Sequence, residues 1–232
     1  FIIPFASFVR FSHKDNHYMN DQMNKIENVE KFINENTNSV PIVLYPGDIW
    51  SGEEKTDNSL PIKKYTNDLQ KNLELYDDLI IIEFDELRKL ASTYIDNVKK
   101  RNNWIFVSFL HKFHFFKTTN IFLKDLNISV SFNLIDGLKK SRVDKSNVDI
   151  ITDSDSLSFV LTWDYGVDTL FVNARFRSSG GKIMNFFRLF LIGTLNNNGR
   201  TFPFGVIGFL LNERSMWKTK FLEIILGKYD LK

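Results

Sequence analysis

FIIPFASFV (residues 1–9) opens the segment that decides the fold of the amino-terminal part of the chain. An apolar run of this kind is typical of a buried strand, and a second one, VPIVLY (residues 40–45), leads into the turn Pro46-Gly47-Asp48. Between the two runs, a helix is predicted from about Asn24 to Glu35 by apolar residues at helical spacing, namely Ile26, Val29, Phe32 and Ile33. Strand, helix and strand in this length predict a β-α-β unit with two parallel strands.

A polar loop joins the first strand to the helix and carries His13-Lys-Asp-Asn-His17, followed by Asn20 and Asp21. In a β-α-β unit this loop and the Asp48 turn lie at the same sheet edge, where open α/β sheets place their sites. Nitrogen and oxygen groups of this kind hold a divalent metal or orient a substrate. The alternative is a surface loop that caps the following helix, with Asp48 as a turn residue and not as a metal ligand or general base.

Composition narrows the class of protein. The chain has 232 residues, of which 43% are hydrophobic and 23 are Phe, so it can build an aromatic core or line an apolar cavity. A formal net charge of +2 argues against a nucleic-acid partner. The absence of Cys excludes disulfides, Cys-ligated metal sites and thiol catalysis, but leaves the redox compartment open. We expect a soluble cytoplasmic protein with no transmembrane segment, and a piece from the carboxy-terminal part of a longer protein.

The remaining chain divides into a helical part and an aromatic-rich part. The polar run 51–59 is predicted to be a surface loop that buries nothing, and helices are predicted at 63–76 and 85–100. We place a boundary near the charged break 99–103. Beyond it the pattern predicts strands at 122–126, 128–134, 148–152 and 169–177 and helices after Asp153, at 183–192 and at 216–225. His111 and His114 lie among Phe residues and are interpreted as packing residues.

The first sixty residues resemble the last β-α-β part of metallo-β-lactamase-fold hydrolases, in the branch that includes ascorbate-phosphate lactonase-like and CMP-sialic-acid-hydroxylase-like proteins. The resemblance rests on Ile3-Pro-Phe-Ala-Ser7, Tyr18-Met-Asn20 and the run from Val40 to Asp48. It implies that Asp48 stands in the region of the family's late metal-binding histidine and that residues 13–20 form the rim of the active site. The family's His-x-His-x-Asp-His motif is absent, and the late histidine is replaced, so this chain alone is not expected to be active.

Residues 104–232 resemble a sterol-carrier-protein-like domain, through a strand at 148–152, a helix at 155–161, a turn at 166–170 and a strand at 171–176. Such a domain wraps a sheet around an apolar tunnel. The resemblances together imply an α/β unit with a partial metallo-β-lactamase αββα fold (residues 1–60), a helical connector (residues 61–103) and an α+β sterol-carrier-like domain (residues 104–232).

Two functions follow as hypotheses. The first is a metal-dependent hydrolase that uses zinc, iron or manganese in the complete protein and acts on a small-molecule substrate, of which a lipid-like molecule is one candidate. For it we expect Asp48 and His13 as catalytic residues, with Asp48 also a metal ligand, and Asn16, Tyr18 and Asn20 as substrate-binding residues. The second is a non-catalytic protein that binds a lipid or another protein on a degenerate scaffold.

Overall fold

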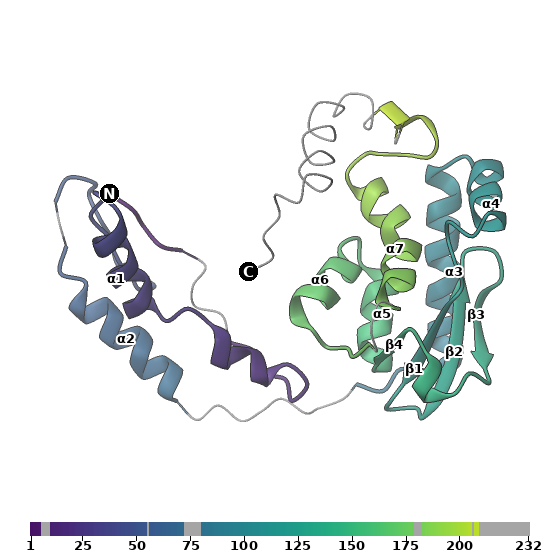
Figure 1. Ribbon diagram of the computed structural model, residues 1–232, viewed down its shortest axis with the longest axis horizontal. Helices are drawn as coiled ribbons and strands as arrows, with labels where there is room; N and C mark the ends of the chain where they lie inside the picture. The colour runs from purple at the N-terminus through teal and green to yellow at the C-terminus, as the bar shows by residue number, and fades with distance from the viewer. Residues whose placement is uncertain (6–9, 55, 72–79, 179–181, 206, 209–232) are drawn as a thin grey trace, which may run out of the picture. The chain divides into compact units, whose positions relative to one another are not determined.

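The structure is a computed structural model that describes residues 1–5, 10–54, 56–71, 80–178, 182–205 and 207–208 (Figure 1). The chain divides into two compact units, Phe1–Asp78 and Leu79–Lys232. This division falls before the boundary placed near residues 99–103, because the helix that precedes those residues packs within the second unit. The described part is mixed α/β, and it contains no helix long and apolar enough to cross a membrane.

The first unit contains a short 3-10 helix, η1 (His17–Gln22), and two α-helices, α1 (Ile26–Asn36) and α2 (Ser59–Gln70). Helix α1 agrees with the prediction, and its apolar positions Ile26 and Ile33 are buried. Helix α2 begins four residues before its predicted start, because Pro61 falls in the first turn, where its missing N–H costs no helical hydrogen bond. The predicted continuation of this helix over 72–76 lies outside the described residues.

The predicted parallel strand pair is reduced to one bridge between Ile2 and Pro41. The amide of Ile2 donates to the Val40 carbonyl at 3.0 Å, and the amide of Ile42 donates to the Ile2 carbonyl at 2.9 Å. Ile42 and Val43 are buried as expected for a central segment. The hydrogen-bonding partner of Val43, however, is the side chain of Asn58 and not a strand. Residues 6–9 of the first predicted strand lie outside the described residues.

The second unit is built around a four-stranded sheet in the order β3-β2-β1-β4. Strands β1 (Thr119–Leu123), β2 (Ile128–Asn133) and β3 (Gly137–Ser141) form an antiparallel meander, and β4 (Ile150–Thr152) lies parallel to β1. A 3-10 turn, η2 (Lys145–Asn147), precedes β4. One face of the sheet enters the core through Ile121, Leu123, Val130, Phe132, Leu138 and Ile150.

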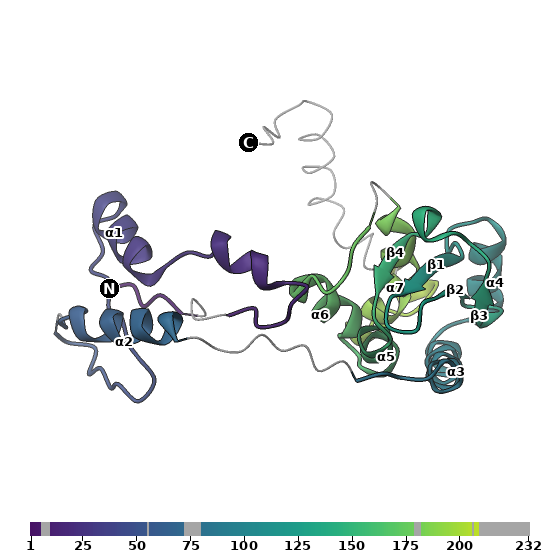
Figure 2. The same ribbon diagram turned by 90° about the horizontal axis from the view of Figure 1, so that it is seen from below.

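Helices cover that face of the sheet. Figures 1 and 2 show α3 (Phe84–Arg101), α5 (Ser154–Thr162) and α7 (Ile183–Asn197) as a layer beside the strands, with α4 (Trp104–Lys112) and α6 (Gly166–Asn173) at its ends. Helix α3 agrees with the prediction, and its apolar stripe is buried at Leu87, Ala91, Ile95 and Val98. Asp153 caps α5 as expected, since its side chain accepts a hydrogen bond from the Ser156 amide.

The strand predicted over 169–177 is wrong for most of its length, because residues 166–173 form helix α6. Val167 and Leu170 are both buried on one side of this helix. Their helical spacing is hard to recognise in the sequence, because the residues next to them are also apolar. Ala174 ends the helix in the left-handed region at φ 50°, and only Arg177 pairs with β4, through Ile151. The strand at 171–176 on which the sterol-carrier resemblance partly rested is therefore absent. The helix predicted at 216–225 lies outside the described residues.

Candidate functional site

The loop residues predicted to surround a site are used mainly to hold their own loop together. The Asn20 side chain accepts a hydrogen bond from the Phe11 amide at 2.9 Å and donates to the carbonyls of Phe11 and His17 at 2.8 and 2.9 Å. His13 and Asn16 are buried, at 7% and 5% exposure, and Nδ1 of His13 accepts from the Asp15 amide. Tyr18 is 64% exposed. Asn20 thus closes the turn through which the other loop residues pass.

Asp48 lies in the predicted turn, which Gly47 closes with φ 93°. One carboxylate oxygen of Asp48 accepts the Tyr45 amide at 2.9 Å, and the other lies 3.5 Å from Nζ of Lys64 on α2. These two contacts support the alternative prediction, in which Asp48 is a turn residue. The same turn is tied to α2 by Tyr65, whose hydroxyl donates to the Leu44 carbonyl.

Tyr45 and Asp68 form the strongest electrostatic pair near this turn. The Tyr45 hydroxyl donates to the Asp68 carboxylate at 2.5 Å, and Lys71 lies at the same distance from the other oxygen. The hydrogen bonds from Lys71 and Tyr45 hold the pKa of Asp68 below its ordinary value. The bond to Asp68 raises the pKa of Tyr45, because loss of the hydroxyl proton would place two negative groups together.

Among the residues that the structure describes, no group of three or more His, Asp or Glu side chains has the arrangement of a metal site. Asp48, the predicted ligand, is engaged by a cation and a backbone amide instead. The metal-dependent hydrolase, with Asp48 as a metal ligand, stays a prediction.

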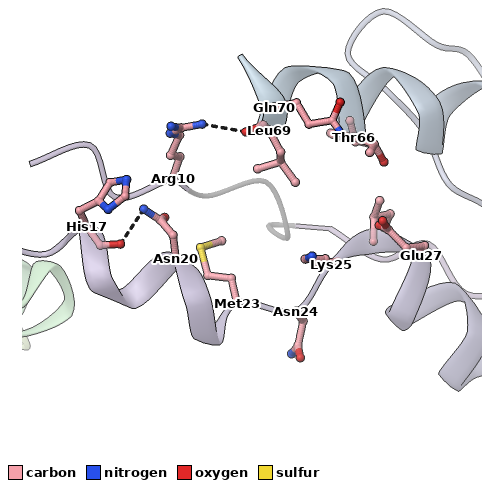
Figure 3. A pocket seen from close by; sticks show the side chains of 12 residues that line it. Arg10, His17, Asn20, Met23, Asn24, Lys25, Glu27, Thr66, Leu69 and Gln70 are labelled. Carbon is pink, nitrogen blue, oxygen red and sulfur yellow. Dashed lines mark hydrogen bonds between the residues drawn. The ribbon is translucent and has the colours of Figure 1, made fainter. Parts of the chain in front are cut away.

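A cavity of about 300 Å³ lies in the first unit, bordered by η1, the start of α1 and the end of α2. Figure 3 shows Arg10, Asn20 and Met23 on one side and the α2 residues Thr66 and Leu69 on the other. The Arg10 guanidinium donates to the Leu69 carbonyl at 3.0 Å and so joins the two sides. Of the predicted catalytic and substrate-binding residues, only Asn20 lines this cavity, together with His17 of the predicted rim; Asp48 and His13 do not.

The second unit carries a polar cluster at the carboxyl ends of the parallel strands β1 and β4. Asp153 is fully buried and lies 3.3 Å from the Arg175 guanidinium and 3.6 Å from Nζ of Lys124. Asp125 follows β1 and accepts from the amide of Ser154, whose hydroxyl in turn accepts the Ile82 amide at 2.8 Å. Charges at this edge are therefore neutralised within the unit, in the place where open α/β sheets carry ligands.

A smaller cavity of about 120 Å³ lies beside this cluster, between α5 and α6. Its lining combines polar side chains with Phe159 and Leu170; the polar members are Asp155, Ser156, Thr169, Asn173 and Arg175. The hydroxyl of Ser156 and Nε of Arg175 are buried and have no hydrogen-bond partner within the described part of the chain. Both atoms are enclosed, so a ligand would reach them only by entering this cavity.

An exposed apolar surface follows α6 and α7 and is here called the α6–α7 surface. Phe171 and Val172 on α6 are 58% and 65% exposed, and Met184 and Leu191 on α7 are 55% and 39% exposed. The rings of Phe171 and Phe187 lie 5.0 Å apart in an edge contact that joins the two helices. The opposite side of α7 is in the core, at Phe186, Leu189, Phe190 and Ile192. Helix α7 therefore carries apolar residues on its inner side and also on its outer side, where Arg188 lies between Met184 and Leu191.

Comparisons with known proteins identify no family model, no curated protein and no solved structure that this chain matches. The α6–α7 surface is not predicted from the sequence, because the pattern at residues 169–177 predicts a strand where helix α6 forms. The signal was present in α7, where Met184, Phe187 and Leu191 recur on the side opposite the core residues.

Proposed function

We propose that the second unit is a binding module for a small apolar molecule, and that the α6–α7 surface is where the ligand binds. The observation that carries this proposal is the apolar outer side of α7. The outer side of a surface helix normally carries polar residues, yet Met184 and Leu191 are exposed here on either side of Arg188. Large exposed apolar patches mark sites of ligand or partner binding, because covering them removes apolar area from water.

The neighbouring helix supports the same proposal. Phe171 projects from α6 between Phe187 and Phe176, at 5.0 and 6.4 Å between ring centroids. Its contacts place several aromatic edges together on one exposed surface, which suits a flat or chain-like hydrocarbon ligand. On another side of α6, Thr169 and Asn173 line the polar cavity that holds the Ser156 hydroxyl. A ligand with an apolar body and a small polar end matches both sides of the helix.

Titration of the full chain with cis-parinaric acid, whose fluorescence rises in apolar surroundings, tests this function. We expect saturable binding. Phe171→Ser combined with Met184→Ser should weaken it by about tenfold or more, because the ligand covers both apolar side chains when it binds. Phe109→Ser is the matched control, since Phe109 is exposed to a similar degree, at 52%, on α4. Equal loss in the control, or no saturable binding, would contradict the proposal.

The polar end of the ligand is tested separately with Ser156→Ala. Displacement of cis-parinaric acid by a long-chain alcohol should weaken in this variant, whereas displacement by the corresponding alkane should not change. The hydroxyl of Ser156 is the group that distinguishes the two competitors. Equal changes for alcohol and alkane would remove Ser156 from the site.

A further inference from the structure

A second exposed apolar face lies on α4, far along the chain from α6 and α7. Ile105, Phe109 and Phe113 follow one another at intervals of four residues and are 84%, 52% and 65% exposed. The opposite side of the helix is anchored in the core through Val107, which is fully buried. The rings of Phe109 and Phe113 lie 4.4 Å apart, so they form one continuous aromatic ridge. We call this ridge, with Ile105, the α4 face.

The segment of the chain that carries the α4 face is basic. Residues 97–124 contain six Lys or Arg, two His and no Asp or Glu, although Lys124 is paired with the buried Asp153 and Asp136 lies within electrostatic range of His111. Lys112 is exposed within α4, and Lys99, Lys100 and Lys117 are exposed on either side of it in the sequence. Nζ of Lys99 lies 4.9 Å from the centre of the Trp104 ring, which holds this cation beside the start of the helix. Arg101 lies 4.0 Å from Asp164, which offsets its charge.

The end of α4 keeps the ridge in place. His114 adopts the left-handed conformation at φ 60°, its amide donates to the His111 carbonyl, and the Phe115 amide donates to the Leu110 carbonyl. These two bonds are those of a Schellman motif, which ends a helix sharply. His111 is fixed as well, because its Nδ1 lies 2.8 Å from the Phe116 carbonyl. The chain therefore turns back into the core at Phe116 and leaves Phe113 at the surface.

We propose that the α4 face docks the protein onto the surface of a membrane that contains anionic lipids. Exposed aromatic and aliphatic side chains enter the boundary between headgroups and acyl chains, while flanking cations attract the negative surface. The basic residues of this segment favour this occupant over a second copy of the chain, because two such faces would bring Lys112 and its neighbours against like charges. A nine-residue helix lies on the membrane and does not enter it fully.

Co-sedimentation of the full chain with lipid vesicles tests the proposal. Vesicles of phosphatidylcholine mixed with phosphatidylserine should bind the protein, vesicles of phosphatidylcholine alone should bind it weakly, and added salt should release it. Phe109→Ser combined with Phe113→Ser should weaken binding by more than about tenfold, since both side chains would leave the lipid boundary. Lys112→Gln should weaken binding to the anionic vesicles about fivefold and leave binding to neutral vesicles unchanged.

Phe32→Ser is the matched control, because Phe32 is exposed to a similar degree, at 62%, on α1; this variant should bind the vesicles as the unaltered protein does. Circular dichroism checks that each variant is folded. Lys112→Gln leaves the aromatic ridge unchanged, so it tests the charge alone. Vesicle binding that is equal for both lipid mixtures, or unchanged in the Phe109 and Phe113 variant, would overturn the proposal. The proposal would also be overturned if the unaltered protein formed a dimer and the variant with Phe109→Ser and Phe113→Ser did not. Because ligand uptake is measured at α6 and α7 with a different probe, the two proposals fail independently.

Discussion

Asn58 holds three segments of the first unit together through a single side chain. Its amide nitrogen donates to the Pro41 carbonyl at 2.9 Å and to the Glu30 carboxylate at 2.7 Å, and its oxygen accepts the Val43 amide at 2.9 Å. The sequence places Asn58 in a polar run that was predicted to bury nothing, yet it is only 7% exposed. That prediction was wrong because a polar side chain is readily buried where it satisfies backbone groups.

Asn58→Ala should destabilise the first unit by about 2 kcal/mol, since it leaves the buried Val43 amide and Pro41 carbonyl without partners. Native-state hydrogen exchange of the amides in α1 and α2 measures the change. Asn38→Ala, at an exposed position in the same unit, should have almost no effect. Equal protection factors in the two variants would show that Asn58 does not hold these segments together.

Asp153 carries the corresponding role in the second unit. It caps α5 and is the fully buried partner of Arg175 and Lys124. Asp153→Ala should lower the free energy of unfolding by about 3 kcal/mol, because it removes a helix cap and leaves two cations with less compensation. Asp155→Ala, which removes a carboxylate that is 32% exposed, should cost less than about 1 kcal/mol. Urea denaturation followed by tryptophan fluorescence measures both, and similar losses would contradict the assigned roles.

At the scale of elements, α6 packs against α5 through a glycine. A Cβ added to Gly166 would lie 2.5 Å from the Phe159 carbonyl oxygen and 2.6 Å from Cα of Val160. Both neighbours are backbone atoms, so the helices would have to separate. Gly166→Ala should therefore destabilise the second unit by about 1–3 kcal/mol in thermal or urea unfolding. Gly208→Ala has open space around it and serves as the control. A Gly166 variant as stable as the control would refute the close packing.

The elements also show what sequence patterns can predict. Helices α1 and α3 were predicted because their apolar residues recur at helical spacing over three turns or more. Strand β2 was predicted because its side chains alternate between the core and the other face. Helix α6 was missed because eight residues contain too few turns to reveal a period, and its identity depends on Gly166 meeting α5. Local sequence patterns therefore fail to predict an element whose type, helix or strand, is decided by tertiary packing.

In the whole molecule, both the cavity of the first unit and the polar cluster of the second are formed by residues that lie far apart in the sequence. The cavity of the first unit joins Arg10 to Leu69, and the polar cluster of the second joins Lys124 to Arg175. No spacing rule connects such positions, because the folded topology brings them together. The predicted site residues could be placed only as a group around one loop, and Asn20 is the member that borders a cavity. The two exposed apolar surfaces became visible only once the core side of α4 and α7 was known.

The account of function rests on the α6–α7 surface as the place where an apolar ligand is bound. Hydrogen–deuterium exchange of the full chain, with and without oleate, measures that location directly. We predict that oleate slows exchange in α6 (Gly166–Asn173) and α7 (Ile183–Asn197) and leaves exchange in α1 and α2 unchanged. Slowed exchange confined to the first unit, or no change in α6 and α7 at an oleate concentration that saturates binding, would contradict the central claim.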